Sequence, residues 1–394
     1  MSVRPTVMHV VLNLMPGGTE RLVVEFARRT RDAVRPVVCC LEERGSLADE
    51  LAAIDVPVIE LHRRPGFRPS LGRQLAAAAG ACGASLLHCH QYSPFVYGLI
   101  AARVDHSLGV IFTEHGRASD APATWKRRLA NAVLGRAPAT IFAVSAALRA
   151  HMIAEGFPPS RVEVIHNGIE LDGCPSTCAT ADNAFDRAAL RQELGVAEDA
   201  IVFGTVARLD PVKDLRSLVT AFQSVHAALP TSHLVIVGDG PEQAALEQQV
   251  KDAQLAEMVT FAGFRDDPRR LLPAFDVYVN SSVYEGIPLT VLEAMAASLP
   301  VVATAVGGTT EVVGSDTGIL VGARRPGELA DVMRRLGASA AWRSALGKRG
   351  RERVAAMFTI ERMVSRYLAA YDAALADRSV VRSSACVVSA GPSR

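Results

Sequence analysis

The sequence predicts an α/β protein made of two doubly wound parallel sheets, and three observations support this fold class. Strand-like apolar runs alternate with helical segments of about ten to fifteen residues along most of the chain. Residues 168–195 lack long apolar runs and are rich in turn-forming residues, which is typical of a linker between domains. The length of 394 residues is sufficient for two domains, each with its own core.

The first series of predicted elements precedes this linker. Its strands are expected at residues 6–14, 37–41, 58–61, 86–90, 109–113, 140–144 and 162–165. Its helices are expected from residue 22, at 47–54, 71–82, 96–104 and 125–134, and from residue 146. We therefore expect an N-terminal Rossmann-like domain at residues 1–190.

The second series predicts another Rossmann-like domain at residues 191–358. Its strands are expected at residues 201–206, 234–237, 259–262, 277–280 and 301–304, and its helices at 215–228, 243–253, 269–274 and from residue 289. Helices are also predicted at 343–358 and 359–375, and the Ser-rich residues 378–394 are predicted to be a disordered tail. In such a pair of domains, ligands are expected in a central cleft beyond the carboxyl ends of the strands.

Composition narrows the class of function. Forty-two basic and 41 acidic residues give a net charge of +1, which argues against a nucleic-acid partner. The seven cysteines include no Cys-x-x-Cys pair, which favours a reducing compartment. No apolar run is long enough to span a bilayer, and the N-terminal apolar run leads into a Gly-Gly turn, so we expect a cytoplasmic protein.

The segment at residues 282–297, SVYEGIPLTVLEAMAA, carries two acids eight positions apart. Gly286 and Pro288 predict a turn, so Glu285 is expected before a helix and Glu293 inside it. Two acids so placed can contact different ends of an elongated ligand, and the free N–H groups of the helix start can bind an anion. A pair of solvated surface charges is the alternative interpretation of the two acids.

Further candidates follow other strands of the second series. Arg208 and Lys213 lie in one loop, where two cations can neutralise a pyrophosphate. Gly238 begins a tight Gly-Asp-Gly-Pro turn, and Gly307 and Gly308 precede a probable helix start, which is another candidate anion site. Ordinary surface cations and structural turns are the alternatives.

The order of these motifs resembles family 4 of the retaining glycosyltransferases, which have the GT-B fold. The resemblance rests on Arg208, Lys213, Glu285-x7-Glu293 and the Gly-Gly-Thr-Thr-Glu turn, and it covers nearly the whole chain. In the first half it includes Pro16-Gly17-Gly18, the His88 and His90 region, residues 113–116, 144–145 and 165–169. The resemblance implies that residues 1–190 form the acceptor domain, together with a helix crossing back at about 359–376, and that residues 191–358 bind the nucleotide sugar.

The resemblance also implies roles for single residues. Arg208 and Lys213 are expected to hold the donor diphosphate, Glu285 the transferred sugar and Glu293 the ribose. The remaining expected contacts are the backbone of Gly286, Ile287, Pro288 and Leu289 beside the sugar, Gly238, the loop with Phe264 and Arg265 beside the base, Gly17 and Gly18 near the phosphate, and His115 near the reacting carbon. Retention of configuration is expected by front-face attack.

No cofactor is required by anything in the sequence. Two cations and helix N-termini can stabilise a leaving phosphate, and the Asp-x-Asp signature of metal-dependent transferases is absent. His88 and His90 have a spacing that could suggest a metal, but no third ligand is evident, and a structural role is favoured. A lone His115 could likewise be a loop residue with a structural hydrogen bond.

A basic bias lies in the first half of the chain. Residues 61–136 contain ten Lys and Arg against three acids. Together with Trp125 and Phe67, this bias suggests peripheral contact with the inner face of a membrane, and a solvated face is the alternative.

These observations predict a metal-independent retaining transferase that moves a hexosyl or N-acetylhexosaminyl group from a nucleoside-diphosphate donor, UDP favoured over GDP, to a hydroxyl acceptor. Bacterial exopolysaccharide, glycolipid or small-molecule glycosylation are the expected settings. A noncatalytic nucleotide-sugar-binding protein and a sugar-nucleotide epimerase on the same fold are the alternatives, and a phosphorylase lacks a recognisable cofactor lysine.

Overall fold

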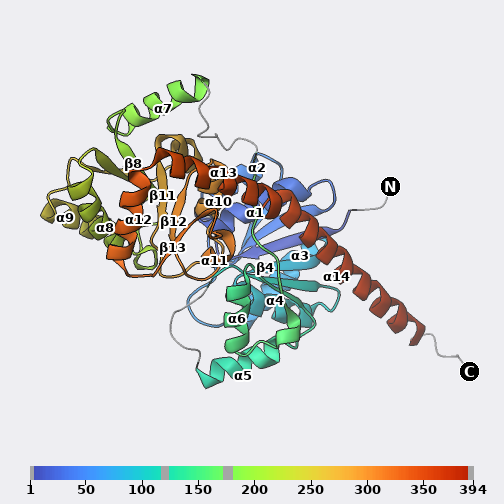
Figure 1. The fold of residues 1–394 in the computed structure, drawn as a ribbon. Helices are drawn as coiled ribbons and strands as arrows, with labels where there is room; N and C mark the ends of the chain where they lie inside the picture. The colour runs from blue at the N-terminus through green and yellow to red at the C-terminus, as the bar shows by residue number, and fades with distance from the viewer. Residues whose placement is uncertain (1–3, 117–123, 172–180, 389–394) are drawn as a thin grey trace, which may run out of the picture. The chain divides into compact units, whose positions relative to one another are not determined.

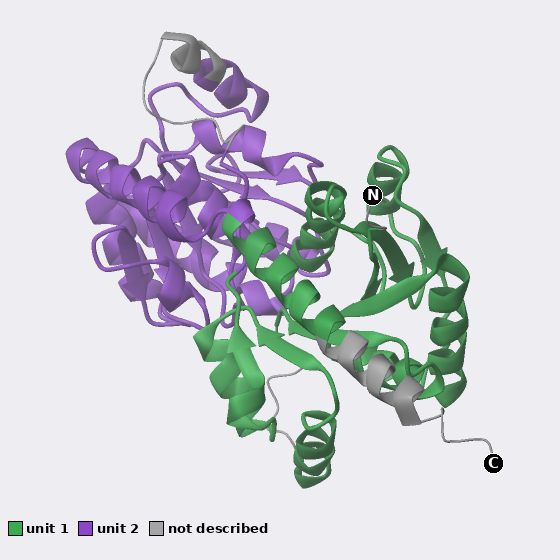
Figure 2. Ribbon diagram, turned by 90° about the vertical axis from the view of Figure 1, so that its right-hand side faces the viewer, with its two compact units in different colours: residues 1–166, 362–394 green, residues 167–361 purple. Residues whose placement is uncertain are grey.

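The computed structural model describes residues 4–116, 124–171 and 181–388, and it divides into two compact units (Figures 1 and 2). Unit 1 comprises residues 1–166 and 362–394, and unit 2 comprises residues 167–361. Each unit is an α/β structure around one parallel sheet. The predicted fold class is therefore confirmed.

Unit 1 contains a seven-stranded sheet in the order β3-β2-β1-β4-β5-β6-β7, in which every pair is parallel. The strands are β1 (Thr6–Val11), β2 (Arg35–Cys40), β3 (Val58–Glu60), β4 (Ala84–His90), β5 (Gly109–Glu114), β6 (Thr140–Ala143) and β7 (Val162–Val164). The helices are α1 (Gly18–Thr30), α2 (Leu47–Ala52), α3 (Pro69–Cys82), α4 (Tyr92–Val104), α5 (Trp125–Leu134), α6 (Ala146–Ala154), the 3₁₀ turn η1 (Pro159–Arg161) and most of α14 (Ile360–Val388).

Unit 2 contains a six-stranded parallel sheet in the order β10-β9-β8-β11-β12-β13. The strands are β8 (Ile201–Val206), β9 (Ser232–Val237), β10 (Val259–Gly263), β11 (Val277–Asn280), β12 (Val301–Thr304) and β13 (Gly318–Val321). The helices are α7 (Ala181–Glu193), α8 (Leu215–Ala228), α9 (Gln243–Asp252), α10 (Leu289–Ala296), α11 (Thr309–Val312), α12 (Pro326–Gly337) and α13 (Ala340–Met357), with 3₁₀ turns η2 (Pro211–Lys213) and η3 (Pro268–Ala274).

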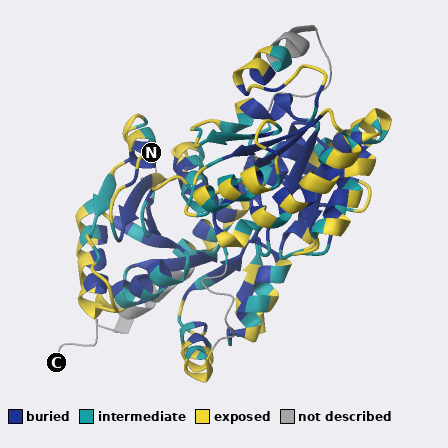
Figure 3. Cartoon of the chain, turned by 90° about the vertical axis from the view of Figure 1, so that its left-hand side faces the viewer, coloured by how far each residue is buried: buried dark blue, intermediate teal, exposed yellow. Residues whose placement is uncertain are grey.

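Burial explains why these strands read as continuous apolar runs. Every residue of β1, β9, β11 and β12 is buried, as the dark strands of Figure 3 show. A parallel sheet covered by helices on both faces needs apolar side chains at successive positions. The core of unit 2 accordingly joins strand residues to the apolar faces of α8, α9 and α12.

Strand order determines where each unit can bind a ligand. In both sheets the connections reverse direction beside the first strand, between β1 and β4 in unit 1 and between β8 and β11 in unit 2. Ligands of doubly wound sheets bind beyond the carboxyl ends of the strands at this reversal. The loops after β8 and β11 contain Arg208, Lys213 and Glu285.

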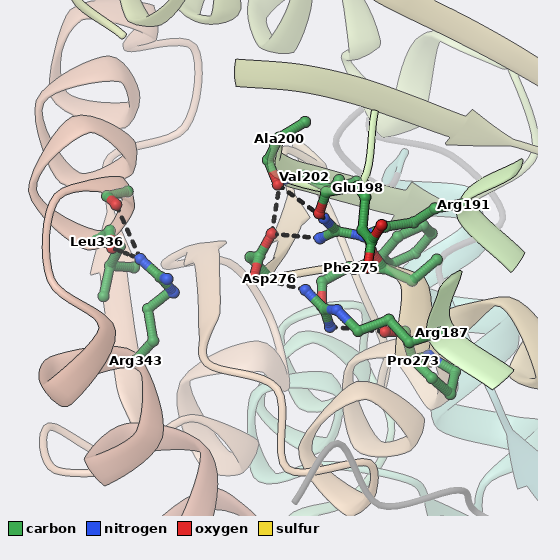
Figure 4. Close-up of polar contacts among 12 residues, drawn as sticks. Arg187, Arg191, Glu198, Ala200, Val202, Pro273, Phe275, Asp276, Leu336 and Arg343 are labelled. Carbon is green, nitrogen blue, oxygen red and sulfur yellow. Dashed lines mark hydrogen bonds and ion pairs between the residues drawn. The ribbon is translucent and has the colours of Figure 1, made fainter. Parts of the chain in front are cut away.

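The boundary between the units differs from the expected one. It falls after His166, not near residue 190, because helix α7, which had been read as linker, belongs to unit 2. Arg187 and Arg191 of α7 donate to the two carboxylate oxygens of Asp276, at 2.7 and 2.8 Å (Figure 4). The same arginines cap carbonyls at the end of η3, which anchors α7 to unit 2.

The chain passes between the units twice, after His166 and after Glu361. Within unit 2, backbone hydrogen bonds join the two segments that lie next to these crossings. Ile169 N–H donates to Phe358 O, and Ile360 N–H donates to Ile169 O, both at 2.9 Å. Gly168 permits this approach, because a Cβ there would lie 2.2 Å from Thr359 O. The motif Asn167-Gly168-Ile169 therefore has a structural role at the point where the chain passes from unit 1 to unit 2.

The C-terminal prediction needs correction. Residues 378–388 continue helix α14, whereas a disordered tail had been expected from residue 378. Ala, Val and Arg permit the helix to continue, and the first helix breakers are Gly391 and Pro392. Residues 389–394 lie outside the described residues. Among the described helices, none is long and apolar enough to cross a membrane.

Candidate active site

The Glu285 carboxylate is the centre of the polar cluster in unit 2. Its Oε1 atom accepts hydrogen bonds from Lys213 Nζ at 2.8 Å, Ser282 Oγ at 2.6 Å and Asn280 Nδ2 at 3.2 Å. The Glu285 side chain is 10% exposed and that of Lys213 is 25% exposed. A partly buried, hydrogen-bonded ion pair at the reversal of strand order fits a binding site better than a solvated pair of surface charges does.

Hydrogen bonds to backbone carbonyls fix the loops that carry this pair. Val283 N–H donates to Val212 O, and Ser281 Oγ donates to Lys213 O, both at 2.8 Å. The loop after β8 and the loop after β11 are therefore tied directly to each other. The separation of Lys213 and Glu285 follows from the backbone of both loops as well as from the salt bridge.

The Gly307-Gly308 turn holds the backbone of Glu285. Gly307 has a φ of +48°, and a Cβ there would lie 1.9 Å from Glu285 O. Gly308 N–H donates to that same carbonyl at 3.2 Å. The turn had been expected to bind an anion; α11 after it has only four residues, and the N–H of its N-cap residue, Gly308, already donates to Glu285 O. In this structure the turn positions the backbone of Glu285.

Arg208 projects from a loop that is braced by the predicted Gly-Asp-Gly-Pro turn. Gly238 and Gly240 adopt φ values of +131° and +153°, and Cβ atoms there would lie 2.0 Å from Ala207 O and 2.5 Å from Leu209 O. The Arg208 side chain is 74% exposed and its Nε donates to Asp210 Oδ2 at 2.6 Å. Gly238 thus fixes the backbone beneath a cation that a ligand can reach.

Glu293 lies inside α10, as predicted, and contacts a different cation. Its Oε1 accepts from Arg269 Nε of η3 at 2.9 Å. The residues between the two acids, Gly286, Ile287 and Pro288, are buried, and Leu289 at the start of α10 is half-buried. The two acids therefore have separate polar environments within one segment.

The loop expected beside a base presents one ring to solvent. Phe264 is 47% exposed. Arg265 donates to Ala262 O at 3.1 Å and pairs with Glu193 of α7 at 3.2 Å. Phe264 is available for stacking on a ligand, whereas the guanidinium of Arg265 contacts the protein.

The predicted residues of unit 1 lie at the start of α1 and directly after β5. Gly17 is the N-cap of α1 in an extended conformation, and Gly18 is the first residue of that helix. His115 follows β5, and its Nε2 forms a hydrogen bond with His90 Nδ1 at 3.0 Å. Burial lowers the pKa of His115 to about 3 and raises the pKa of the neighbouring Glu114 to about 8.

A buried histidine cluster was not foreseen as a unit. His88 and His90 point to the same face of the sheet as His9 of β1, which pairs with His88 in register, and all three are fully buried. One ring nitrogen from each of the three side chains lies within 4.8 Å of the corresponding nitrogen of the other two. The sequence supplied His88 and His90, but only the strand order places β1 beside β4.

These buried histidines predict that acid destabilises unit 1. Burial depresses the pKa values of His9, His88, His90 and His115, so the unfolded chain takes up protons below pH 6.5 that the folded chain does not. Glu114 opposes one of them, because its raised pKa makes the folded state bind a proton between about pH 4.5 and 8. The net difference of three protons gives a loss approaching about 4 kcal/mol per pH unit near pH 5.

Urea unfolding followed by far-UV circular dichroism at pH 7 and pH 5.5 measures this loss. In a Trp125→Phe variant, Trp342 is the remaining tryptophan, and its fluorescence reports the unfolding of unit 2. Unit 2 serves as an internal control, because His233 is the only described histidine of this unit whose pKa is lowered in the same way. We expect the unit 1 transition to move to much lower urea at pH 5.5. Equal midpoints at the two pH values would contradict the assigned burial.

The structure thus brings together some predicted residues and adds others. Lys213 and Glu285 are in contact, Gly238 and Gly307 brace the loops, and Arg208 and Glu293 lie on neighbouring segments. The partners missed by sequence reasoning are Asn280, Ser282, Asp210, Gly240 and Arg269. The polar run Asn280-Ser281-Ser282 at the end of the apolar strand β11 could have indicated Asn280 and Ser282 as site residues.

Comparison with known proteins identifies the family. Residues 16–172 match the family described as Glycosyltransferase Family 4, and residues 186–353 match the family described as Glycosyl transferases group 1. The chain belongs to family 4 of the glycosyltransferases. The predicted resemblance is confirmed, and the enzyme is a glycosyltransferase with the GT-B fold.

Individual relatives of this glycosyltransferase agree with that assignment. EpsF of Bacillus subtilis strain 168, named as a glycosyltransferase, is 27% identical over 308 residues, which cover 75% of this chain and 77% of EpsF. An Escherichia coli UDP-Gal:α-D-GlcNAc-diphosphoundecaprenol α-1,3-galactosyltransferase is 29% identical over 242 residues, 58% of this chain and 59% of the relative. The solved structure of Anabaena HepE, with UDP and glucose, has a TM-score of 0.83 at 23% identity and covers 94% of this chain and all of HepE.

Proposed function

We propose that this glycosyltransferase moves a sugar from a nucleoside-diphosphate donor to a hydroxyl acceptor with retention of configuration and without a metal ion. The observation that carries the proposal is the Lys213–Glu285 contact at the reversal of strand order in unit 2, with the exposed Arg208 in the same loop as Lys213. At this position the cations can bind the negatively charged diphosphate, and the acid can accept hydrogen bonds from sugar hydroxyls.

Each polar group has a place in the proposed chemistry. Lys213 and Arg208 bind the diphosphate and stabilise the negative charge that grows on the leaving phosphate as its bond to the sugar breaks. Glu285 accepts hydrogen bonds from sugar hydroxyls, while Ser282 and Asn280 orient its carboxylate. Glu293 accepts from the ribose hydroxyls, and Phe264 stacks on the base.

Metal independence is proposed from the cations and the sequence. Two side chains supply positive charge where a divalent ion would otherwise be needed. An Asp-x-Asp signature does not occur in the chain. A UDP-sugar is the favoured donor, and the solved HepE structures with UDP and with UDP-glucose are consistent with that preference.

Nucleotide release tests the proposal. The full chain is incubated with UDP- and GDP-sugars in excess chelator, with and without a panel of hydroxyl acceptors, and the anomeric configuration of any product is determined by NMR. We expect acceptor-dependent release of UDP and a product with the anomeric configuration of the donor. Tight donor binding without nucleotide release with any acceptor would refute sugar transfer. A strict need for a divalent ion would refute metal independence, and a product of inverted configuration would refute retention.

The acceptor is proposed to be presented at an anionic lipid surface that contacts α5, placing the enzyme in the cytoplasm at the inner face of the membrane. Trp125, Leu129 and Val133 are 71, 61 and 65% exposed and recur every four residues along α5, the mostly exposed helix at the bottom of Figure 3. Lys126 and Arg128 are also exposed on this helix. An apolar stripe beside basic residues is the pattern of a helix that lies on anionic lipid. A lipid-linked acceptor, as in the name of the Escherichia coli relative, would suit this surface.

Flotation on liposomes tests the lipid contact. We expect the wild-type chain to float with vesicles containing an anionic phospholipid at low salt, and binding to fall with added salt because the basic residues are screened. A Leu129→Ser, Val133→Ser double variant should lose binding, and Val212→Ser, at an exposed apolar residue of unit 2, is the matched control. Equal flotation of the double variant and the wild type would rule out α5 as the contact.

A further inference from the structure

The two cations in the loop after β8 are each paired with one acid of unit 2. Lys213 Nζ lies 2.8 Å from Glu285 Oε1. The guanidinium of Arg208 lies against Asp210, with its Nε 2.6 Å and its Nη2 2.5 Å from Asp210 Oδ2. Glu285 binds the sugar in the proposed function, whereas Asp210 has no ligand there. Asp210 is therefore an acid of this loop whose purpose is still unexplained.

Protein groups occupy both oxygen atoms of the Asp210 carboxylate. Oδ1 accepts from Val212 N–H at 3.0 Å, which makes Asp210 the N-cap of η2, and Oδ2 accepts from Arg208. The Asp210 side chain is 9% exposed, whereas that of Arg208 is 74% exposed. A buried carboxylate with both oxygens engaged is poorly placed to contact a ligand. Any effect of Asp210 on the reaction is therefore exerted through the groups that it holds.

Backbone hydrogen bonds fix the main chain on both sides of Arg208. Ala207 N–H donates to Val237 O at 3.0 Å, and Leu209 N–H donates to Asp239 O at 2.7 Å. These bonds determine where the side chain of Arg208 begins, but they leave its guanidinium free to move. A long, mostly exposed side chain loses conformational entropy when it is ordered, so a fixed orientation needs a partner at the guanidinium itself.

Asp210 supplies that partner and selects which edge of the guanidinium it binds. It is the only hydrogen-bond or ion-pair partner of the Arg208 guanidinium among the described residues. A guanidinium has two edges with paired donors, one formed by Nε and Nη2 and the other by Nη1 and Nη2. Asp210 engages the first edge, on the buried side. The second edge is left open to solvent and can bind two oxygen atoms of a phosphate.

The turn that carries Lys213 is held independently of this guanidinium. Val283 N–H donates to Val212 O and Ser281 Oγ donates to Lys213 O, both at 2.8 Å. These bonds from the loop after β11 are additional to the cap that Asp210 Oδ1 provides. Loss of the acceptor for the guanidinium alone should therefore release the arginine and leave Lys213 in place.

We propose that Asp210 is a positioning residue, whose carboxylate fixes the Arg208 guanidinium before the donor binds and so presents its Nη1–Nη2 edge to the departing phosphate. A hydrogen-bond donor that is already oriented stabilises the growing charge without reorganising during the reaction. The use of Arg208 on the diphosphate rests on the proposed function, whereas its fixed orientation does not.

Motion of the Arg208 guanidinium tests the contact without any substrate. In Asp210→Asn and Asp210→Ser one oxygen remains for Val212 N–H, as at other N-caps, and none is left for Arg208. The heteronuclear ¹H–¹⁵N NOE of the Arg208 Nε–H group is measured in the full chain labelled with ¹⁵N-arginine, with the signal assigned from Arg208→Ala. We expect an ordered group in the wild type and a mobile one in both Asp210 variants. Equal NOE values would overturn the proposal.

Kinetics and binding of the same variants separate positioning from packing. We expect kcat for nucleotide release, with the donor and acceptor found in the screen, to fall about tenfold, the upper value for ordering one long side chain. The affinity for UDP, measured by calorimetry in chelator, should not fall, because a negative charge near the diphosphate has been removed. Asp331→Asn, at an exposed ion pair of α12, is the control and should change neither value.

Two results of these measurements would contradict positioning. One is a wild-type kcat in the folded Asp210→Asn and Asp210→Ser enzymes. The other is a loss of UDP affinity as large as the loss of kcat, because a merely structural role would disturb the turn that carries Lys213 and would weaken binding of the diphosphate in the same measure.

A double-mutant cycle with Arg208→Ala distinguishes this inference from the proposed function. Arg208→Ala should lower kcat by more than Asp210→Asn does, and adding Asp210→Asn to it should cause no further loss. A further loss of the same factor would refute positioning through Arg208 and leave the proposed function intact. If Arg208 becomes mobile in Asp210→Asn but Arg208→Ala keeps the wild-type kcat, the fixed orientation stands and the use of Arg208 on the leaving phosphate is refuted.

Discussion

Replacing Lys213 by alanine is expected to lower kcat by about 10²–10³-fold, the usual loss when one preorganised donor to a developing negative charge is removed. Lys213 is the only cation that contacts Glu285 among the described residues, and it lies in the loop beside Arg208. Without its ammonium group the leaving phosphate loses charge stabilisation and Glu285 loses its counter-ion. Steady-state nucleotide release at saturating donor measures the effect.

Glu285→Gln is expected to give a loss of similar size by a different route. The amide keeps the volume of the carboxylate and can still accept from Ser282, but it weakens acceptance from sugar hydroxyls and leaves the ammonium of Lys213 uncompensated. Lys251→Ala, at an exposed lysine of α9, is the matched control and should leave kcat unchanged. A folded Lys213→Ala or Glu285→Gln enzyme with near-normal kcat would refute the assignment of this pair to the reaction.

Asp276→Ala is expected to destabilise unit 2 by about 3–5 kcal/mol, because it leaves buried positive charge without a partner. The Arg191 side chain is 4% exposed and donates to Asp276 Oδ2, which also accepts from Val202 N–H at 2.8 Å (Figure 4). Arg187 loses its contact with Oδ1 in the same variant. Urea unfolding followed by Trp342 fluorescence measures the change in unit 2.

A surface salt bridge provides the comparison for Asp276. Asp331 pairs with Arg334 on α12 with a side chain that is 65% exposed. Asp331→Ala should cost less than about 1 kcal/mol, since exposed ion pairs contribute little. Equal losses for Asp276→Ala and Asp331→Ala would show that the α7 cluster does not stabilise unit 2 as its burial implies.

Much of the fold was predictable because parallel sheets need long apolar runs. The strands of the unit 1 sheet, the strands of the unit 2 sheet up to β12, and the position of Glu293 within a helix followed from periodicity alone, whereas the short strand β13 was not predicted. Helix α7 was missed because its sequence reads as polar: it is held to unit 2 by Arg187 and Arg191, whose partner Asp276 lies more than 80 residues further along the chain. Interactions between distant segments are invisible to local pattern.

The sequence predicted residues that belong to the candidate site, but it did not predict how they are arranged. Family resemblance supplied Arg208, Lys213 and Glu285, but not which side chains orient them. Gly307 illustrates the limit: its sequence context suggested an anion site, and only the structure shows that its left-handed conformation makes room for the carbonyl of Glu285. The buried histidine cluster depends on strand order, which brings His9 beside residues about 80 positions later.

In the proposed function, the segment from Glu285 to Glu293 binds the two ends of a nucleotide sugar. Calorimetric titration of UDP and of the UDP-sugar found in the donor screen, in chelator, into wild type, Glu285→Gln and Glu293→Gln tests it most directly. We expect Glu293→Gln to weaken binding of both ligands, whereas Glu285→Gln should leave UDP binding intact and remove the additional affinity due to the sugar. Unchanged binding of both ligands to both variants would contradict it.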